Sequence, residues 1–247
     1  MLTKSCSPNH VVQIMRVETG MRINTKALAA ELAGMLIVFG GAMFSAAGTI
    51  DWVAGWVFLI LFFSFAVALS VWLLKHDPGL LKERMTMFRP EQKAWDKVFL
   101  PIALIGFMSW LVLMPLDAVR FQWSRMPFWL QPVGAVIMLL SFYVFFLAYR
   151  ENHYLSPMVR IQSDRGQHVI STGPYSYVRH PLYSGVILLT VGTSLLLGSW
   201  YGLVAGLIIV VMVAIRAVFE ERMLRAELKG YAGYMSRVRY RLIPHVW

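Results

Sequence analysis

Uncharged apolar runs, each about as long as a membrane is thick, recur along this chain and constrain its fold more than any other feature. The hydrocarbon core of a bilayer is about 30 Å thick, so a helix of about 20 apolar residues crosses it. Five runs of that size or longer are present: Leu32–Ile50, Trp52–Leu74, Val98–Leu116, Met126–Tyr149 and Pro181–Ile215. The composition agrees, because 58% of the 247 residues are hydrophobic and 15% are charged, against roughly 25% charged in a soluble domain.

The last run is too long for one helix, and Gly198-Ser199-Trp200-Tyr201-Gly202 interrupts it near its middle. Glycine-rich segments of this kind form turns, so the run predicts a helical hairpin. The fold class is therefore an all-α integral membrane helical bundle of about six transmembrane helices, the last two paired as a hairpin. A cytoplasmic C-terminal helical segment, Phe219 to Leu228, should continue from the sixth span and end at Gly230.

The whole chain, 1–247, is predicted to be a single domain. It divides into a cytoplasmic N-terminal segment (1–26), four membrane helices (27–149) and a C-terminal region (150–247) that holds the candidate functional residues. The charged connector 75–97 also contains apolar side chains, which is typical of backbone at the level of the lipid head groups. We expect a simple connector there, with a lid as the alternative.

Basic residues give the orientation, since Lys and Arg gather on the cytoplasmic side of membrane proteins. With six spans and a cytoplasmic N-terminus, all but Arg120 and Arg125 of the 23 Lys and Arg residues fall on the cytoplasmic side. Both termini are thus predicted to be cytoplasmic in a multi-pass protein, in the plasma (inner) membrane if the host is bacterial.

The net charge of +10 has a membrane explanation, because basic loops beside helix ends meet anionic lipid head groups. We therefore expect membrane lipids as partners and no nucleic acid. Cys6 is the single cysteine, which excludes an internal disulfide and a thiolate metal cluster. No metal is expected.

A rigid, aromatic turn precedes the hairpin in Gly173–Gly185 (GPYSYVRHPLYSG). Pro174 and Pro181 fix the backbone, and Pro181 falls at the first turn of the membrane helix. The N–H groups of such a helix start favour a carboxylate or another anion. Tyr175 and Tyr183 offer aromatic faces that could stack on a base or attract a sulfonium cation. The alternative is an ordinary interfacial belt of aromatic and basic residues.

A second group of polar residues follows the hairpin. Arg216 lies four residues before Glu220, and Glu221 is the next residue after Glu220. Residues four apart share a helix face, so Arg216 and Glu220 could pair. Ionisable groups are costly at the edge of the hydrocarbon, which favours a functional role. The alternative is a snorkelling arginine with an ordinary surface ion pair.

The ordered combination of RHPLY, a hairpin, a Glu pair and a closing segment (FEERMLRAELKGYAGYMSRVRYRLIP) resembles the superfamily of isoprenylcysteine carboxyl methyltransferases and phospholipid methyltransferases. The resemblance covers about 70 residues, and 80 with the approach from Gln162; the first four helices match only in being hydrophobic. It implies S-adenosylmethionine as cofactor and S-adenosylhomocysteine as product, bound on the cytoplasmic side. The residues it places at the cofactor are Gln162, Gln167, His168, Val169, Ile170, Tyr175, His180, Pro181, Leu182, Tyr183 and Glu220.

The resemblance also places Arg216 toward the substrate, although this needs a one-residue shift in the hairpin. Methyl transfer from a sulfonium needs positioning and water exclusion more than proton transfer. An acceptor carboxylate would already be ionised near neutral pH, and Arg216 could hold it bidentately. An amine or thiol would have to lose a proton, with Glu221 and His180 as possible bases.

The predicted function is methyl transfer to a lipidic or small apolar acceptor that enters from the bilayer, with an isoprenylcysteine-type carboxylate preferred. Phospholipid amines and small thiols are alternative acceptors. Two alternatives lie outside methyl transfer: a membrane NADPH-dependent sterol or enone reductase, whose C-terminal architecture is related, and a non-catalytic membrane scaffold.

Overall fold

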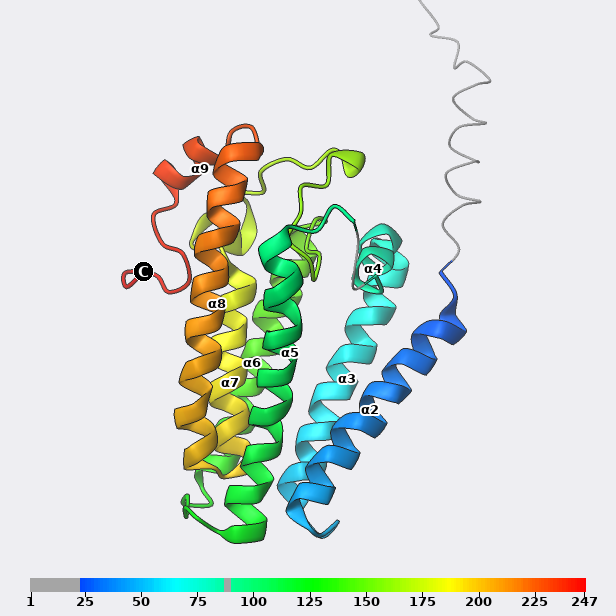
Figure 1. Cartoon of the computed structure of the whole chain (residues 1–247), viewed down its shortest axis with the longest axis vertical. Coiled ribbons are helices and arrows are strands. Elements are labelled where there is room, and N and C mark those ends of the chain that lie inside the picture. The colour runs from blue at the N-terminus through cyan, green and yellow to red at the C-terminus, as the bar shows by residue number, and fades with distance from the viewer. Residues whose placement is uncertain (1–22, 87–89) are drawn as a thin grey trace, which may run out of the picture.

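The computed structural model describes residues 23–86 and 90–247, and in this part of the chain the regular structure is helical. The predicted N-terminal segment 1–26 lies almost wholly outside the described residues. The helices, shown in Figure 1, are α2 (Thr25–Ala47), α3 (Val53–His76), α4 (Pro78–Arg84), α5 (Ala94–Pro115), α6 (Leu130–Glu151), α7 (Pro181–Leu197), α8 (Trp200–Glu227) and α9 (Tyr231–Arg237). Short π or 3-10 turns are η1 (Leu116–Phe121), η2 (Ser163–Arg165) and η3 (Gly173–Ser176).

The bundle contains the six apolar helices that the sequence predicts. Among the described residues, α2, α3, α5 with η1, α6 and α8 are long and apolar enough to cross a membrane. The sixth, α7, is also apolar but has 17 residues, which at 1.5 Å per residue is about 25 Å. The protein is therefore a multi-pass helical membrane bundle in which α7 is the shortest of the six apolar helices.

The predicted hairpin is present, and its turn falls where the sequence places it. Gly198 ends α7 in the left-handed region with φ of 76°, which glycine adopts without steric cost. Ser199 then caps α8, since its side chain accepts a hydrogen bond from the N–H of Gly202 at 2.8 Å. In Figure 1, α7 lies between α6 and α8.

The first helix begins earlier than the apolar run that predicts it. Asn24 caps α2 by accepting hydrogen bonds from the N–H groups of Lys26 and Ala27, at 3.1 and 3.2 Å. The helix therefore starts at Thr25 and not at Leu32. The uncharged run begins only at Leu32 because Lys26 and Glu31 are charged. A cap, by contrast, stabilises a helix end whatever the hydropathy of the residues that follow.

The helices pack through aromatic and small side chains near the middle of the bundle. Phe39, Phe58, Trp110, Met138 and Leu197 are buried in one continuous cluster that joins α2, α3, α5, α6 and α7. Figure 1 shows α2 and α3 as an antiparallel pair that leans away from the other spans toward the end where α9 lies.

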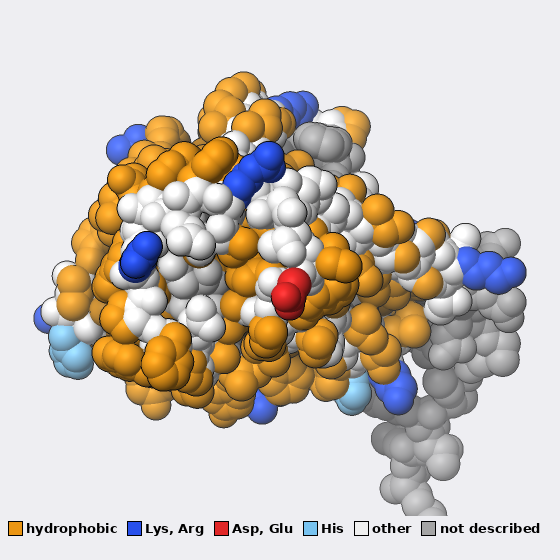
Figure 2. All heavy atoms as spheres, turned by 90° about the horizontal axis from the view of Figure 1, so that it is seen from below, with side chains coloured by type: hydrophobic (Ala, Val, Ile, Leu, Met, Phe, Trp, Pro, Cys, Tyr) orange, Lys and Arg blue, Asp and Glu red, His pale blue; other side chains and the backbone are white. Residues whose placement is uncertain are grey.

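A buried carboxylate closes the opposite end of the bundle, which Figure 2 shows from below as mostly hydrophobic with few charged side chains. Asp117, in η1, is fully buried. It accepts hydrogen bonds from the Ser199 hydroxyl at 2.6 Å and from the N–H and hydroxyl of Ser124 at 2.8 and 2.7 Å. Asp117 thereby ties the end of α5 to the turn between α7 and α8.

We expect Asp117→Asn to lower the free energy of unfolding by about 1–3 kcal/mol, the usual cost of leaving a buried polar group unsatisfied. An amide has one acceptor oxygen where the carboxylate has two, so the donors of Ser199 and Ser124 cannot all keep their bonds. Thermal unfolding in detergent measures the loss. Wild-type stability would contradict it.

Candidate functional site

Polar and aromatic side chains surround a cavity at the end of the bundle where α9 lies. The cavity has a volume of about 840 Å³, part of it open to solvent. Its walls come from the loop between α6 and α7, the start of α7, the final turns of α8, and α9. Ten of the thirteen residues predicted for the site line it: Gln167, His168, Val169, Ile170, Tyr175, His180, Leu182, Tyr183, Arg216 and Glu220.

The turn into α7 presents two rings side by side. Pro181 is the first residue of α7, as predicted, and it is buried outside the cavity wall. The rings of His180 and Tyr183 stack with centroids 5.4 Å apart and an interplanar angle of 16°. His180 and Tyr183 therefore line the cavity, whereas Pro181 shapes the turn and does not face the cavity.

Glu221 lies behind this wall at the centre of a buried charge cluster. Its carboxylate accepts hydrogen bonds from Nε of Arg179 at 2.6 Å and from Nε of Arg241 at 2.8 Å, and Nε2 of His180 lies 3.2 Å away. Its side chain is 3% exposed and does not line the cavity. The geometry therefore does not favour Glu221 as a base acting directly on a substrate.

The same cluster fastens the C-terminal segment to the turn before α7. The N–H groups of Arg179 and His180 donate to the carbonyls of Tyr240 and Arg241, both at 2.9 Å. The hydroxyl of Ser184 also donates to the carbonyl of Leu242. The attached segment, residues 240–242, is called the strap. Glu221 is thus the ionic centre that holds the strap against one side of the cavity.

Glu220, one position earlier on α8, faces the cavity. Its carboxylate accepts a hydrogen bond from the hydroxyl of Tyr183 at 2.7 Å. Arg216 lines the cavity too, but it pairs with Asp96 of α5 at 3.1 Å and donates to the carbonyl of Pro157 at 2.6 Å. The expected pairing of Arg216 with Glu220 is therefore replaced by a pairing with Asp96, a residue that sequence spacing could not suggest.

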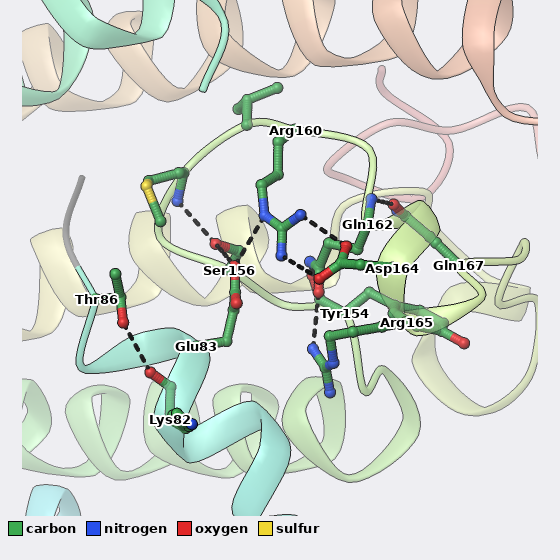
Figure 3. A network of polar contacts seen from close by, with 12 residues as sticks. Lys82, Glu83, Thr86, Tyr154, Ser156, Arg160, Gln162, Asp164, Arg165 and Gln167 are labelled. Carbon is green, nitrogen blue, oxygen red and sulfur yellow. Dashed lines mark hydrogen bonds and ion pairs between the residues drawn. The ribbon is translucent and has the colours of Figure 1, made fainter. Parts of the chain in front are cut away.

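A buried ion pair holds the loop between α6 and α7 against α4, as Figure 3 shows. Nε of Arg160 donates to Glu83 at 3.0 Å, and its Nη1 donates to Asp164 at 2.9 Å. Burial lowers the pKa of Arg160, but the hydrogen bonds to Asp164 and Glu83 outweigh it, so the pKa lies above its usual value. Arg160 therefore stays charged, and its ion pair with Glu83 attaches the connector 75–97, which contains α4, to the cavity wall.

Gln162 organises this loop and does not reach the cavity. Its Nε2 donates to the carbonyl of Tyr154 at 2.7 Å, and its own N–H donates to the side chain of Gln167 at 2.7 Å. The side chain is 1% exposed. The loop turns at η2, where Gly166 lies in the left-handed region at φ of 65°. Gln162 therefore positions Gln167, which does line the cavity.

Three buried tyrosines form a wall of which the sequence predicted only Tyr175. The hydroxyl of Tyr234 donates to the carbonyl of Tyr175 at 2.7 Å. The hydroxyl of Tyr231 is buried without a hydrogen-bond partner among the described residues. Burial raises the pKa of Tyr175, Tyr231 and Tyr234, so these hydroxyls stay protonated, and the hydroxyl of Tyr231 can donate to a ligand.

Other lining residues come from segments without a motif. They are Asn152, Tyr154, Leu155, Ser156, Met158, Val159 and Arg160. Arg179, Met223, Leu224 and Leu228 also line the cavity; they lie within the two motif segments but were not predicted for the site. The GYAGY spacing at the chain end was the one sequence signal for Tyr231 and Tyr234.

Fold and cavity together define a class: an integral membrane helical bundle with a polar, aromatic binding site at one end. Residues 129–229 match the family model for phospholipid methyltransferase, and this stretch runs from the start of α6 to the end of α8. The match confirms the resemblance drawn from the RHPLY and FEER segments, both of which lie within the matched residues. A comparison with curated proteins finds no match.

The cavity suits the cofactor that such a family implies. Glu220 is the one carboxylate among the described lining residues, and it could pair with the ammonium of a methionine moiety. The unpartnered hydroxyl of Tyr231 is a donor without an acceptor, and the His180–Tyr183 pair offers aromatic faces. These groups match the charges and ring of S-adenosylmethionine.

Proposed function

We propose that the protein transfers a methyl group from S-adenosylmethionine to a lipid acceptor in this cavity, which faces the cytoplasm. The observation that supports this most is the Tyr183–Glu220 pair beside stacked His180, inside the stretch that matches the family. Residues 150–247 would supply the catalytic region of a single domain.

The division of roles follows from the contacts. When bound, S-adenosylmethionine supplies an electrophilic methyl group on a sulfonium. Glu220 would hold the amino group of the methionine part, and Tyr183 fixes the Glu220 carboxylate by its hydrogen bond. The segment Gln167–Ile170 and Tyr175 would enclose the adenosine. The protonated hydroxyl of Tyr231 would donate to a polar group of the ligand.

An apolar groove gives a lipid access to this cavity from the side. It has a volume of about 1160 Å³, open in part, and lies between α2, α3, α6 and α7. Leu182 lines both the groove and the cavity. The groove follows α3 from Phe62 to Leu73, which at 1.5 Å per residue is about 16 Å. A hydrocarbon chain in the groove would place its head group beside Leu182.

The charge near Arg216 supports a proposal for the acceptor class. An isoprenylcysteine-type carboxylate would need a guanidinium free to pair with it, but Asp96 already compensates Arg216. The family description names phospholipids. In a phospholipid with an amine head group the reacting atom is the nitrogen, which carries no negative charge. We therefore favour a phospholipid amine over a carboxylate or a small thiol.

An ammonium must lose its proton before nitrogen can attack. His180 lines the cavity, and its Nε2 lies 3.2 Å from Glu221. A carboxylate at one ring nitrogen fixes the orientation and tautomer of the imidazole, as in other general bases oriented by an acid. We propose His180 as the proton acceptor, with Glu221 as its positioning residue.

Binding of S-adenosylhomocysteine to the detergent-purified protein tests the function. Calorimetry should detect binding to the wild type, and labelled S-adenosylmethionine should transfer its methyl group to host lipid extract. Stabilisation by NADPH alone would instead support a reductase. A protein that responds to neither cofactor would contradict the proposal.

Substitution at the Tyr183–Glu220 pair should weaken that binding. We expect Glu220→Gln to reduce affinity for S-adenosylhomocysteine about 10- to 100-fold, because a hydrogen bond to a charged group contributes about 1.5–3 kcal/mol. Tyr183→Phe should have a smaller effect in the same direction. Glu227→Gln, on the same helix but paired with Lys93 at the surface, is the control and should bind like the wild type. Unchanged affinity in Glu220→Gln would remove Glu220 from the site.

A further inference from the structure

Asp96 is a fully buried carboxylate near the start of α5, and three elements converge on it. Its Oδ2 accepts hydrogen bonds from the N–H of Val159 at 2.8 Å and from Nε2 of Gln92 at 2.9 Å. Its Oδ1 lies 3.1 Å from Nη2 of Arg216. Asp96 therefore contacts both α8 and the loop that lines the cavity.

These contacts fix the guanidinium of Arg216 in one place. Nη2 of Arg216 also donates to the carbonyl of Pro157 at 2.6 Å, and the group lies 5.5 Å from the ring centre of Phe99. Val159 completes the attachment, because its carbonyl accepts from the N–H of Lys93 at 3.1 Å. The loop, α5 and α8 thus form one unit around Arg216.

Arg216 is the most accessible of the three arginines that line the cavity. The side chains of Arg160 and Arg179 are 3% and 6% exposed, and that of Arg216 is 13% exposed. Each pairs with a carboxylate outside the cavity lining: Glu83, Glu221 and Asp96 respectively. A ligand that meets a cation in this cavity therefore meets Arg216, and Asp96 determines how much positive charge it presents.

We propose that Asp96 is a positioning and specificity-determining residue: it fixes Arg216 at the cavity wall and neutralises it, so that the cavity takes neutral or cationic head groups and rejects anions. This proposal rests on the proposed function only in naming the head group as that of the acceptor. The charge balance itself follows from the Asp96–Arg216 pair and from Glu220, which adds a carboxylate to the same wall. Two unit charges a few ångströms apart interact strongly where water is excluded, so removing one should change ligand preference.

Decanoate and decylamine test this preference, because they share a chain and differ in charge. Binding is measured by calorimetry on the full chain in detergent. The wild type should bind decylamine more tightly than decanoate. Asp96→Asn should bind decanoate about tenfold more tightly than the wild type does. The gain should vanish in the double variant Asp96→Asn with Arg216→Met.

Asp117→Asn is the matched control, since Asp117 is an equally buried carboxylate at the other end of the same span. It should lose stability without any change in decanoate binding. A folded Asp96→Asn variant that binds decanoate no better than the wild type would overturn the proposal. A gain that persists in the double variant would overturn it as well.

Loss of one partner from a buried ion pair can prevent folding, whereas loss of both is often tolerated. A second comparison therefore uses Arg216→Met and the double variant. Arg216→Met leaves Asp96 uncompensated, so it should bind decylamine about tenfold more tightly than the double variant does. Equal affinities would overturn the proposal. Failure of the wild type to bind S-adenosylhomocysteine would contradict the proposed function and leave these amphiphile comparisons valid.

Discussion

Replacement of Glu221 with alanine is expected to lower the free energy of unfolding by about 3–5 kcal/mol, the cost of removing one partner from a buried ion pair. The change leaves Arg179, whose side chain is 6% exposed, without its carboxylate partner. It also removes the ion pair between Glu221 and Arg241 that holds the strap. Thermal and chemical unfolding in detergent measure the loss. Because the strap also fixes the turn with His180, affinity for S-adenosylhomocysteine should fall with it.

Glu227→Ala is the control for this experiment. Glu227 pairs with Lys93 at 2.7 Å, but both side chains are at least one-third exposed, and surface ion pairs contribute about 0–1 kcal/mol. Glu221→Ala should therefore be several times more destabilising than Glu227→Ala. Equal stabilities, combined with loss of methyl transfer in Glu221→Ala alone, would show that Glu221 acts on the substrate and not as the centre of the strap.

The two adjacent glutamates show what a sequence cannot settle. Successive residues on a helix point about 100° apart, so Glu220 and Glu221 face different surroundings. A motif identifies the pair, but only the packing of α8 decides which faces the cavity and which binds Arg179 and Arg241. For the same reason the carboxylate partner of Arg216 was not predictable: Asp96 lies on another helix, 120 positions away in the chain.

The bundle itself was predictable because hydrocarbon imposes one requirement on every span. Lipid offers no hydrogen bonds to backbone, so an apolar run of sufficient length must be helical. The hairpin turn at Gly198 followed from the same run. The loop 152–160 was not predictable, since it lines the cavity through contacts such as Arg160 with Glu83, and no local pattern encodes those contacts.

Substitution of Gly134 with alanine is expected to destabilise the protein by about 3 kcal/mol or more, at the upper end of the cost of overpacking. A Cβ at Gly134 of α6 would collide with backbone atoms of Gly192 and Leu196 on α7, and one at Gly192 would collide with the backbone of Met138. Backbone cannot rotate away as a side chain can. Small residues that let membrane helices approach closely are a common basis of their association. Unfolding in detergent measures the effect.

Gly34→Ala is the matched control, because Gly34 lies in α2 and a Cβ there would meet no atom of the described residues within 4 Å. Alanine is the better helix former by about 1 kcal/mol, so this variant should be as stable as the wild type or more so. The contact matters for the site because α7 begins with the wall formed by Leu182 and Tyr183. A displaced α7 moves that wall relative to Glu220 on α8, so Gly134→Ala should also weaken S-adenosylhomocysteine binding. Equal stability of Gly134→Ala and Gly34→Ala would mean that α6 and α7 do not approach so closely, and the position of the cavity wall would then need another explanation.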